Sequence, residues 1–165
     1  MTKNPLPKAA ASPKSTTVKP KKPAPLKAER QLAQQIIAAA LDTKAENVVM
    51  YDMAGLSPIA DFVVVCSGRS QSHVRGVVDR VEALVKKELG QDPQVSEGYL
   101  EGSWVLLDYG DVILHVFHPE TRAYYNLDEL LDTFHHEAFA SEDTPLAKPQ
   151  PKKASKATAH APAIA

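Results

Sequence analysis

Residues 104–118, WVLLDYGDVILHVFH, combine two apolar runs with two aspartates, two histidines and one tryptophan. Paired carboxylates can hold metal ions, and histidines can transfer protons or bind metals. Asp108 and Asp111 are three residues apart and flank a turn, so they do not share a face of a regular strand. His115 and His118 are also three apart and are expected on opposite faces. This spacing favours neither a metal pair nor an acid–base pair.

Other groups that could carry chemistry give similarly weak signals. Residues 67–70, SGRS, lie between a predicted strand and a predicted helix, where backbone N–H groups can bind phosphate, but one glycine is more typical of an ordinary turn. His135 and His136 are adjacent in a predicted helix and would diverge by about 100°. Cys66 ends an apolar strand and is expected to be buried and inert. The sequence predicts a binding protein without a catalytic, metal or cofactor site.

The aromatic and polar residues of 104–118 are expected on one face of a hairpin joined at Gly110. Side chains alternate between the two faces of a strand, and a two-residue loop pairs residue 105 with 116 and residue 107 with 114. One face is predicted to pack under helices: Val105, Leu107, Tyr109, Val112, Leu114 and Val116. The other is mixed: Trp104, Leu106, Asp108, Ile113, His115 and Phe117.

The mixed face has two interpretations. Aromatic anchors dominate the energetics of many interfaces, and an acidic rim around them would suit a basic partner. The acidic residues on or near the hairpin are Glu97, Glu101, Asp108, Asp111 and Glu120. Alternatively, a helix covers this face, His115 is an ordinary core histidine, and the carboxylates are simply solvated. Composition leaves both interpretations open.

The elements that position the hairpin follow from hydrophobic periodicity. Helices are predicted near residues 28–44, 70–89 and 126–139. Strands are predicted near residues 47–53, 61–67, 94–98, 104–109 and 112–118. Ser70 or Ser67 is expected to cap the second helix and Gly90 to end it, and the run Val63–Val65 is expected to be buried on both faces. The order predicts an α/β fold, with a mixed sheet packed with helices.

Charge and proline divide the chain into three parts. Residues 31–140 hold seven basic and seventeen acidic residues, a net charge of −10, whereas residues 1–30 carry +7 and residues 141–165 carry +2. Ten of the thirteen prolines lie in those two ends. We therefore predict a folded domain over 28–140 between disordered Lys/Pro/Ala-rich tails at 1–27 and 141–165. An acidic body with basic arms suits partners of mixed charge, such as a ribonucleoprotein.

No apolar stretch approaches the roughly 20 residues of a membrane span, so no membrane partner is expected. The N-terminal residues lack the apolar core of a secretory signal, and a lone cysteine suits a reducing compartment. We expect a cytoplasmic protein.

Two long segments resemble one known family. They are LDTKAENVVMYDMAGLSPIADFVVVCSGRSQSHVR and EGYLEGSWVLLDYGDVILHVFHPETRAYYNLDEL, which together cover about residues 30–132. Both are similar to the ribosomal silencing factor family, also called Iojap-related. Its most specific pieces here are Trp104 through Phe117, with Gly98, Gly102, Arg122, Tyr124 and Tyr125. The resemblance implies a fold similar to nucleotidyltransferases without their catalytic carboxylates.

The resemblance also implies a function that is not enzymatic. The family binds the large ribosomal subunit, mainly through ribosomal protein fourteen of that subunit, and blocks joining of the small subunit. Translation is thereby repressed when nutrients are short. The partner surface of the family includes the region that matches Trp104, Asp108, Tyr109 and Asp111. With the mixed face of the hairpin, the expected partner-binding residues are Glu101, Trp104, Asp108, Tyr109, Asp111, His115 and Phe117.

Two alternatives accompany this function. Organellar relatives are associated with assembly of the large subunit, so an assembly factor is one alternative. An RNA-binding module that acts through its basic tails is the other, and weak contacts of the tails with ribosomal RNA are expected in either case. Leu131 stands where relatives usually carry a tryptophan, so the edge of the interface differs here if that tryptophan contacts the ribosome. The oligomeric state is left open.

Overall fold

The computed structural model describes residues 27–140 of the chain. The predicted tails, apart from Lys27, lie outside the described residues. Within them, six strands form one mixed sheet in the order β3-β4-β5-β2-β1-β6. The strands are β1 (Glu46–Asp52), β2 (Phe62–Ser67), β3 (Val95–Glu97), β4 (Trp104–Asp108), β5 (Val112–Phe117) and β6 (His135–Phe139). The helices are α1 (Lys27–Asp42), α2 (Gln71–Leu89), α3 (Pro119–Tyr125) and α4 (Leu127–Leu131). The predicted α/β class with a mixed sheet is confirmed.

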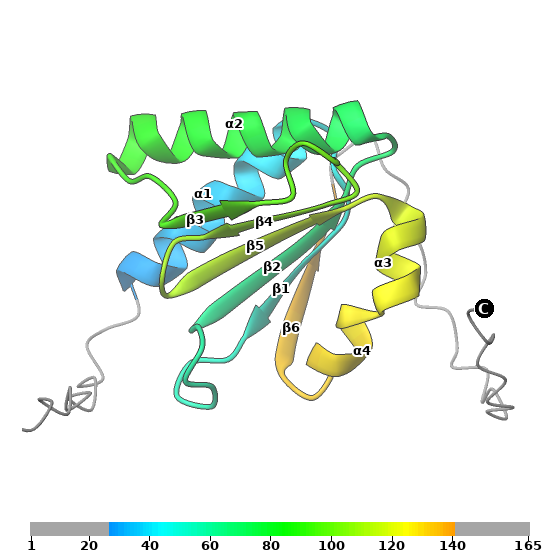
Figure 1. Cartoon of the computed structure of the whole chain (residues 1–165). Coiled ribbons are helices and arrows are strands. Elements are labelled where there is room, and N and C mark those ends of the chain that lie inside the picture. The colour runs from blue at the N-terminus through cyan, green and yellow to red at the C-terminus, as the bar shows by residue number, and fades with distance from the viewer. Residues whose placement is uncertain (1–26, 141–165) are drawn as a thin grey trace, which may run out of the picture.

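Helices cover the two faces of the sheet unequally (Figure 1). The long helices α1 and α2 lie together on one face, and the short helices α3 and α4 lie on the other. Successive residues of β2 alternate between two apolar clusters: Val64 packs with the α1 and α2 residues, whereas Val63 and Val65 pack with Leu131 of α4. All six residues of β2 are buried, as its apolar run predicts.

The predicted pairing of the hairpin is confirmed. Val105 pairs with Val116 and Leu107 with Leu114 in the antiparallel β4–β5 ladder. The N–H of Tyr109 donates to the carbonyl of Val112 at 2.9 Å, which closes a two-residue loop. Because the parity holds, the predicted apolar face lies in the main core under the long helices: Val105, Leu107, Tyr109, Val112, Leu114 and Val116.

Helix α2 begins and ends at the predicted residues. The Ser70 hydroxyl accepts a hydrogen bond from the N–H of His73 at 3.1 Å, which satisfies one free donor of the first turn. Gly90 adopts the left-handed conformation, φ 65°, and its N–H donates to the carbonyl of Lys86. Glycine tolerates this conformation without steric cost, so it ends the helix cleanly.

The predicted helix near 126–139 is wrong. The chain instead forms α3 and α4, separated by Asn126 in the left-handed conformation, and then the strand β6. Strand β6 pairs antiparallel with β1, with Val49 opposite Ala138. His135 and His136 therefore lie on an edge strand and not on a helix. Val49 and Ala138 are 89 residues apart in the chain, so local periodicity does not reveal this pairing. The edge of β1 supplies the hydrogen bonds that make the segment a strand.

Candidate functional site

Trp104 lies at the centre of an aromatic cluster at the start of β4. Its ring stacks on Phe117 of β5 with centroids 4.9 Å apart and meets Tyr125 of α3 at 4.8 Å. Tyr124 packs edge-on against Tyr125 at 5.1 Å and is itself 82% exposed. The cluster thus passes from fully buried Phe117, through half-buried Trp104, to exposed Tyr124. The exposed aromatic surface of Tyr124 and Trp104 is therefore supported by a side chain that is packed in the core.

His115 lies next to Trp104 on the same face of the hairpin. The indole Nε1–H donates to Nδ1 of His115 at 3.0 Å, so the proton of the neutral imidazole sits on Nε2. Burial lowers the pKa of His115 to about 4. At neutral pH the ring is therefore uncharged and able to accept this bond.

A groove opens between the segment before β4 and helix α3. It encloses about 570 Å³. Its lining residues are Gly98, Glu101, Ser103, Trp104, Glu120, Thr121, Tyr124 and Tyr125. Trp104 and the two tyrosines supply the apolar surface, while Glu101 and Glu120 are exposed and contribute negative charge. An aromatic surface with carboxylates beside it suits a lysine or arginine side chain.

Helix α2 holds the segment that forms one wall of this groove. Arg75 donates to the carbonyls of Tyr99 and Leu100 at 3.0 and 2.7 Å, and the Tyr99 hydroxyl donates to Asp79 at 2.8 Å. These contacts leave Leu100 85% exposed. Gly98 has φ +83°, and a Cβ there would lie 2.0 Å from the carbonyl oxygen of Trp104, so a side chain would displace the segment.

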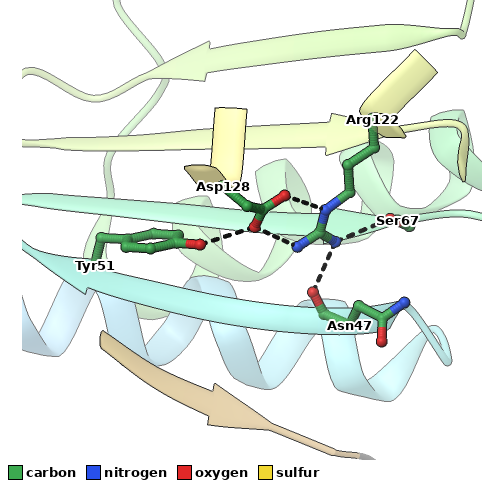
Figure 2. Close-up of polar contacts among 5 residues, drawn as sticks. All are labelled: Asn47, Tyr51, Ser67, Arg122 and Asp128. Carbon is green, nitrogen blue, oxygen red and sulfur yellow. Dashed lines mark hydrogen bonds and ion pairs between the residues drawn. The ribbon is translucent and has the colours of Figure 1, made fainter. Parts of the chain in front are cut away.

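Arg122 attaches α3 and α4 to the sheet (Figure 2). It binds both carboxylate oxygens of Asp128 at 2.8 Å, and it also donates to the Asn47 carbonyl and the Ser67 hydroxyl. The Tyr51 hydroxyl donates to Asp128 at 2.8 Å. Burial alone would raise the pKa of Asp128, but the hydrogen bonds and charge of Arg122 outweigh it and lower the pKa. This network fixes the helix that carries Tyr124 and Tyr125.

The structure separates the predicted partner-binding residues into two groups. Glu101, Trp104, His115 and Phe117 belong to the end of the hairpin near α3, whereas Asp108, Tyr109 and Asp111 surround the turn at its other end. The two ends of β4 are about 14 Å apart, at roughly 3.4 Å per residue. One interface of standard size can span that length, but no single contact can.

Two of the predicted residues have almost no exposed surface. Phe117 is 0% exposed, so it supports Trp104 from beneath and is not itself an apolar anchor for a partner. Tyr109 is buried in the main core, and its hydroxyl has no hydrogen-bond partner within residues 27–140. Side chains alternate along the hairpin, and this alternation places the Tyr109 side chain on the face under α1 and α2. The same side chain therefore cannot lie on the mixed face with Trp104.

The carboxylates at the turn have local contacts. Asp108 accepts a hydrogen bond from the N–H of Gly110 at 2.7 Å, which stabilises the turn. Asp111 lies close to Asp61 and Glu29, and their oxygens are within 4.8 Å of one another. Within residues 27–140 it is the one group of three or more histidine, cysteine or acidic side chains whose ligand atoms lie this close together. Sequence spacing missed it because its members come from three elements that only the fold brings together.

Tyr124 and Tyr125 line the groove but were not among the expected partner-binding residues, and exposed Leu100 lies next to Glu101 of its lining. Glu120, expected only as an acidic residue near the hairpin, lines the groove as well. Tyr124 and Tyr125 belong to the stretch that carries the family resemblance, and adjacent tyrosines are an unusual pair for an exposed short helix. That pair was a usable signal. Leu100 had none, because its exposure depends on the contacts of Arg75 with its own backbone. Cys66, in contrast, is buried as predicted, and burial raises the pKa of its thiol to about 12.

Comparison with known proteins decides the family. A family model described as "Ribosomal silencing factor during starvation" matches residues 26–164. The chain belongs to this family. The description names a regulatory factor of the ribosome and no reaction. None of the helices within residues 27–140 has the length and apolar content that a membrane-spanning segment requires.

Members of the family from several bacteria are similar to this chain. A ribosomal silencing factor of Halalkalibacterium halodurans is 44% identical over 61% of this chain and 86% of its own length. That of Bacillus subtilis is 41% identical over 58% and 81%. A crystal structure of a protein from Chromobacterium violaceum covers 73% of this chain and 96% of its own, with a TM-score of 0.60 and 31% identity. Relatives in Arabidopsis thaliana are named chloroplastic and mitochondrial Iojap proteins.

Leu131 occupies the position at which the family resemblance leads one to expect a tryptophan. It is buried and packs in the second apolar cluster with Tyr51, Met53 and Val63. In this chain the position therefore belongs to the core beneath α4 and not to the groove beside Trp104.

Proposed function

We propose that this member of the family represses translation by binding the large ribosomal subunit and preventing the small subunit from joining. The observation that carries the proposal is the exposed groove in which Trp104, Tyr124 and Tyr125 lie beside Glu101 and Glu120. Interfaces are enriched in aromatic residues, and a few such anchors dominate binding. Family membership supports the ribosome as the target.

The partner is expected to present basic side chains. Residues 31–140 carry a net charge of −10, so the domain attracts a positively charged surface and would be repelled by bare RNA. A lysine or arginine that entered the groove would contact aromatic faces and pair with Glu101 or Glu120. The resemblance of residues 104–117 to the docking stretch of the family supports ribosomal protein fourteen of the large subunit as the direct contact.

Asp108 and Asp111 would extend the interface to the other end of the hairpin. Both are partly exposed near the turn, about 14 Å from Trp104 along β4. Charges at the rim of an interface mainly speed association and add little affinity. Their replacement by asparagine should therefore slow binding at low salt more than it weakens the final complex.

Sedimentation of purified large and small subunits with the full-length protein tests the proposal. The wild-type protein should migrate with the large subunit and reduce the fraction of joined ribosomes. Trp104→Ala should weaken binding by about 2 kcal/mol, or roughly 30-fold. Lys87→Ala is a control, because the Lys87 side chain is 79% exposed on α2, which lies on the face of the sheet away from α3 and the groove (Figure 1).

Each alternative function has its own outcome in this experiment. If the protein migrates with the large subunit but the subunits still join, the proposed function changes from repressor to assembly or storage factor. Loss of co-migration on deletion of residues 1–26 and 141–165, with no effect of Trp104→Ala, would favour an RNA-binding module that acts through its tails. Absence of any co-migration would overturn ribosome binding. The cytoplasmic location stays a prediction, since three relatives are named for chloroplasts or mitochondria.

A further inference from the structure

Trp104 is fixed by contacts on several sides before any partner binds. Phe117 lies against one side of its ring at 4.9 Å and Tyr125 packs against it at 4.8 Å. Both are ring-to-ring contacts that restrict the position and tilt of the indole, and neither is a hydrogen bond to its N–H. Within residues 27–140, the indole N–H donates its hydrogen bond to Nδ1 of His115 at 3.0 Å.

The position of His115 in the ladder explains this hydrogen bond. Trp104 pairs with Phe117 and Leu106 pairs with His115, so His115 is the diagonal neighbour of Trp104 on the mixed face. Diagonal neighbours are within reach of long and aromatic side chains. The imidazole is also 5.9 Å from the indole and 6.1 Å from the Phe117 ring, both measured between centroids. His115 thus offers the indole both an acceptor and a packing surface.

We propose that His115 is a positioning residue: it presents Trp104 to the ribosomal partner by accepting the hydrogen bond of the indole. This inference rests on the proposed function of Trp104 as an anchor. In this proposal His115 acts through Trp104, whereas the sequence led us to expect that His115 itself contacts the partner; the ring is half-buried beside Trp104 and Phe117. An anchor that is already oriented loses less conformational freedom on binding, and pre-organisation of this kind strengthens affinity.

Two substitutions separate the hydrogen bond from the packing. His115→Phe keeps a flat ring that can pack against Phe117, but it has no acceptor. His115→Asn places an amide oxygen where Nδ1 lies and removes the rest of the ring. If the hydrogen bond positions Trp104, His115→Phe should weaken binding to the large subunit by roughly 3- to 10-fold, which corresponds to the net contribution of one hydrogen bond. His115→Asn should then retain most of the wild-type affinity.

NMR of the free protein provides a readout that does not depend on the ribosome. Trp104 is the single tryptophan of the chain, so one indole N–H resonance reports this bond. In His115→Phe this proton should shift upfield and exchange faster with water than in the wild type, whereas in His115→Asn it should stay close to the wild-type position. The backbone amide spectrum shows that each variant is folded. His115→Leu, which also lacks an acceptor, replaces His115→Phe if that variant does not fold.

The opposite pattern would overturn the proposal. If the acceptor-free variant binds as the wild type does while His115→Asn binds poorly, His115 acts by packing alone. An indole resonance that does not respond to loss of the acceptor would lead to the same conclusion. Failure of the proposed function looks different: Trp104→Ala would then bind the large subunit normally, whereas the indole resonance would still respond to His115→Phe.

Discussion

The two faces of the β4–β5 hairpin have the same backbone but different surroundings. On the face under α1 and α2, Val105, Leu107 and Leu114 are all fully buried. On the other face, Trp104, Leu106 and His115 are only half-buried, because the short helices α3 and α4 cover less of the sheet. A hairpin can therefore hold a fold together with one set of alternating residues and offer the next set to a partner.

The largest expected effect on stability comes from the face under the long helices. Leu114→Ala should lower the free energy of unfolding by about 3 kcal/mol, because it removes buried methyl groups and leaves a cavity. Leu106→Ala, on the other face of the same hairpin, should cost clearly less, since Leu106 is only half-buried. Urea denaturation measures both. Equal losses would mean that the two faces contribute alike to the core.

The next effect concerns the attachment of α3 and α4. Arg122→Met keeps a long side chain but removes both bonds to Asp128, so the free energy of unfolding should fall by about 2 kcal/mol. Asp128→Asn in the Arg122→Met background should recover part of the loss, because it removes the unpaired carboxylate. A double-mutant cycle in urea gives the coupling between the two residues. Additive losses would contradict a direct interaction.

Acid provides a second check on the same pair. The contacts with Arg122 lower the pKa of Asp128 in the folded chain, so the unfolded chain binds a proton more readily there. The stabilisation by this pair is therefore fully present above about pH 4 and is lost as the pH falls through the lower pKa of the folded state. The difference in unfolding free energy between wild type and Arg122→Met should narrow in that range.

His115 should make the mixed face sensitive to mild acid. Its pKa is lowered from 6.5 to about 4 by burial, so between these values the unfolded chain binds a proton that the folded chain does not. The free energy of unfolding should then decrease by about 1 to 2 kcal/mol as the pH falls from 6.5 to 4, allowing for partial exposure of the ring. Comparison of the free energy of unfolding of wild type and His115→Asn across this pH range isolates the contribution of His115. If the two proteins lose stability in parallel as the pH falls, His115 does not cause the acid sensitivity.

The smallest effect on stability is expected at the outer edge of the groove. Tyr124 is 82% exposed, so Tyr124→Ala should change the free energy of unfolding by less than about 0.5 kcal/mol. Binding to the large subunit should nevertheless weaken, because the groove loses an aromatic wall. Parallel denaturation and sedimentation measurements test this separation. Wild-type binding by this variant would restrict the docking surface to Trp104 and the hairpin.

Much of the fold could be predicted from local pattern. Ser70 and Gly90 mark helix α2 because capping depends on neighbours within four residues. The run Val63–Val65 indicated a central strand, and the parity of the hairpin placed Leu107 and Leu114 on one face. The family resemblance indicated Trp104 from the sequence alone, because residues 104–117, which carry the resemblance, are contiguous in the chain.

Residues 126–139 and the candidate site required the tertiary structure. The sequence determined which side chains of the hairpin share a face, because alternation is a property of every extended strand. It could not determine how much of that face α3 and α4 cover. This coverage depends on Arg122 bonding to Asn47 and Ser67, residues far away in the chain. The burial of Phe117, the half-exposure of Trp104 and the formation of β6 all follow from long-range contacts, which local periodicity does not encode.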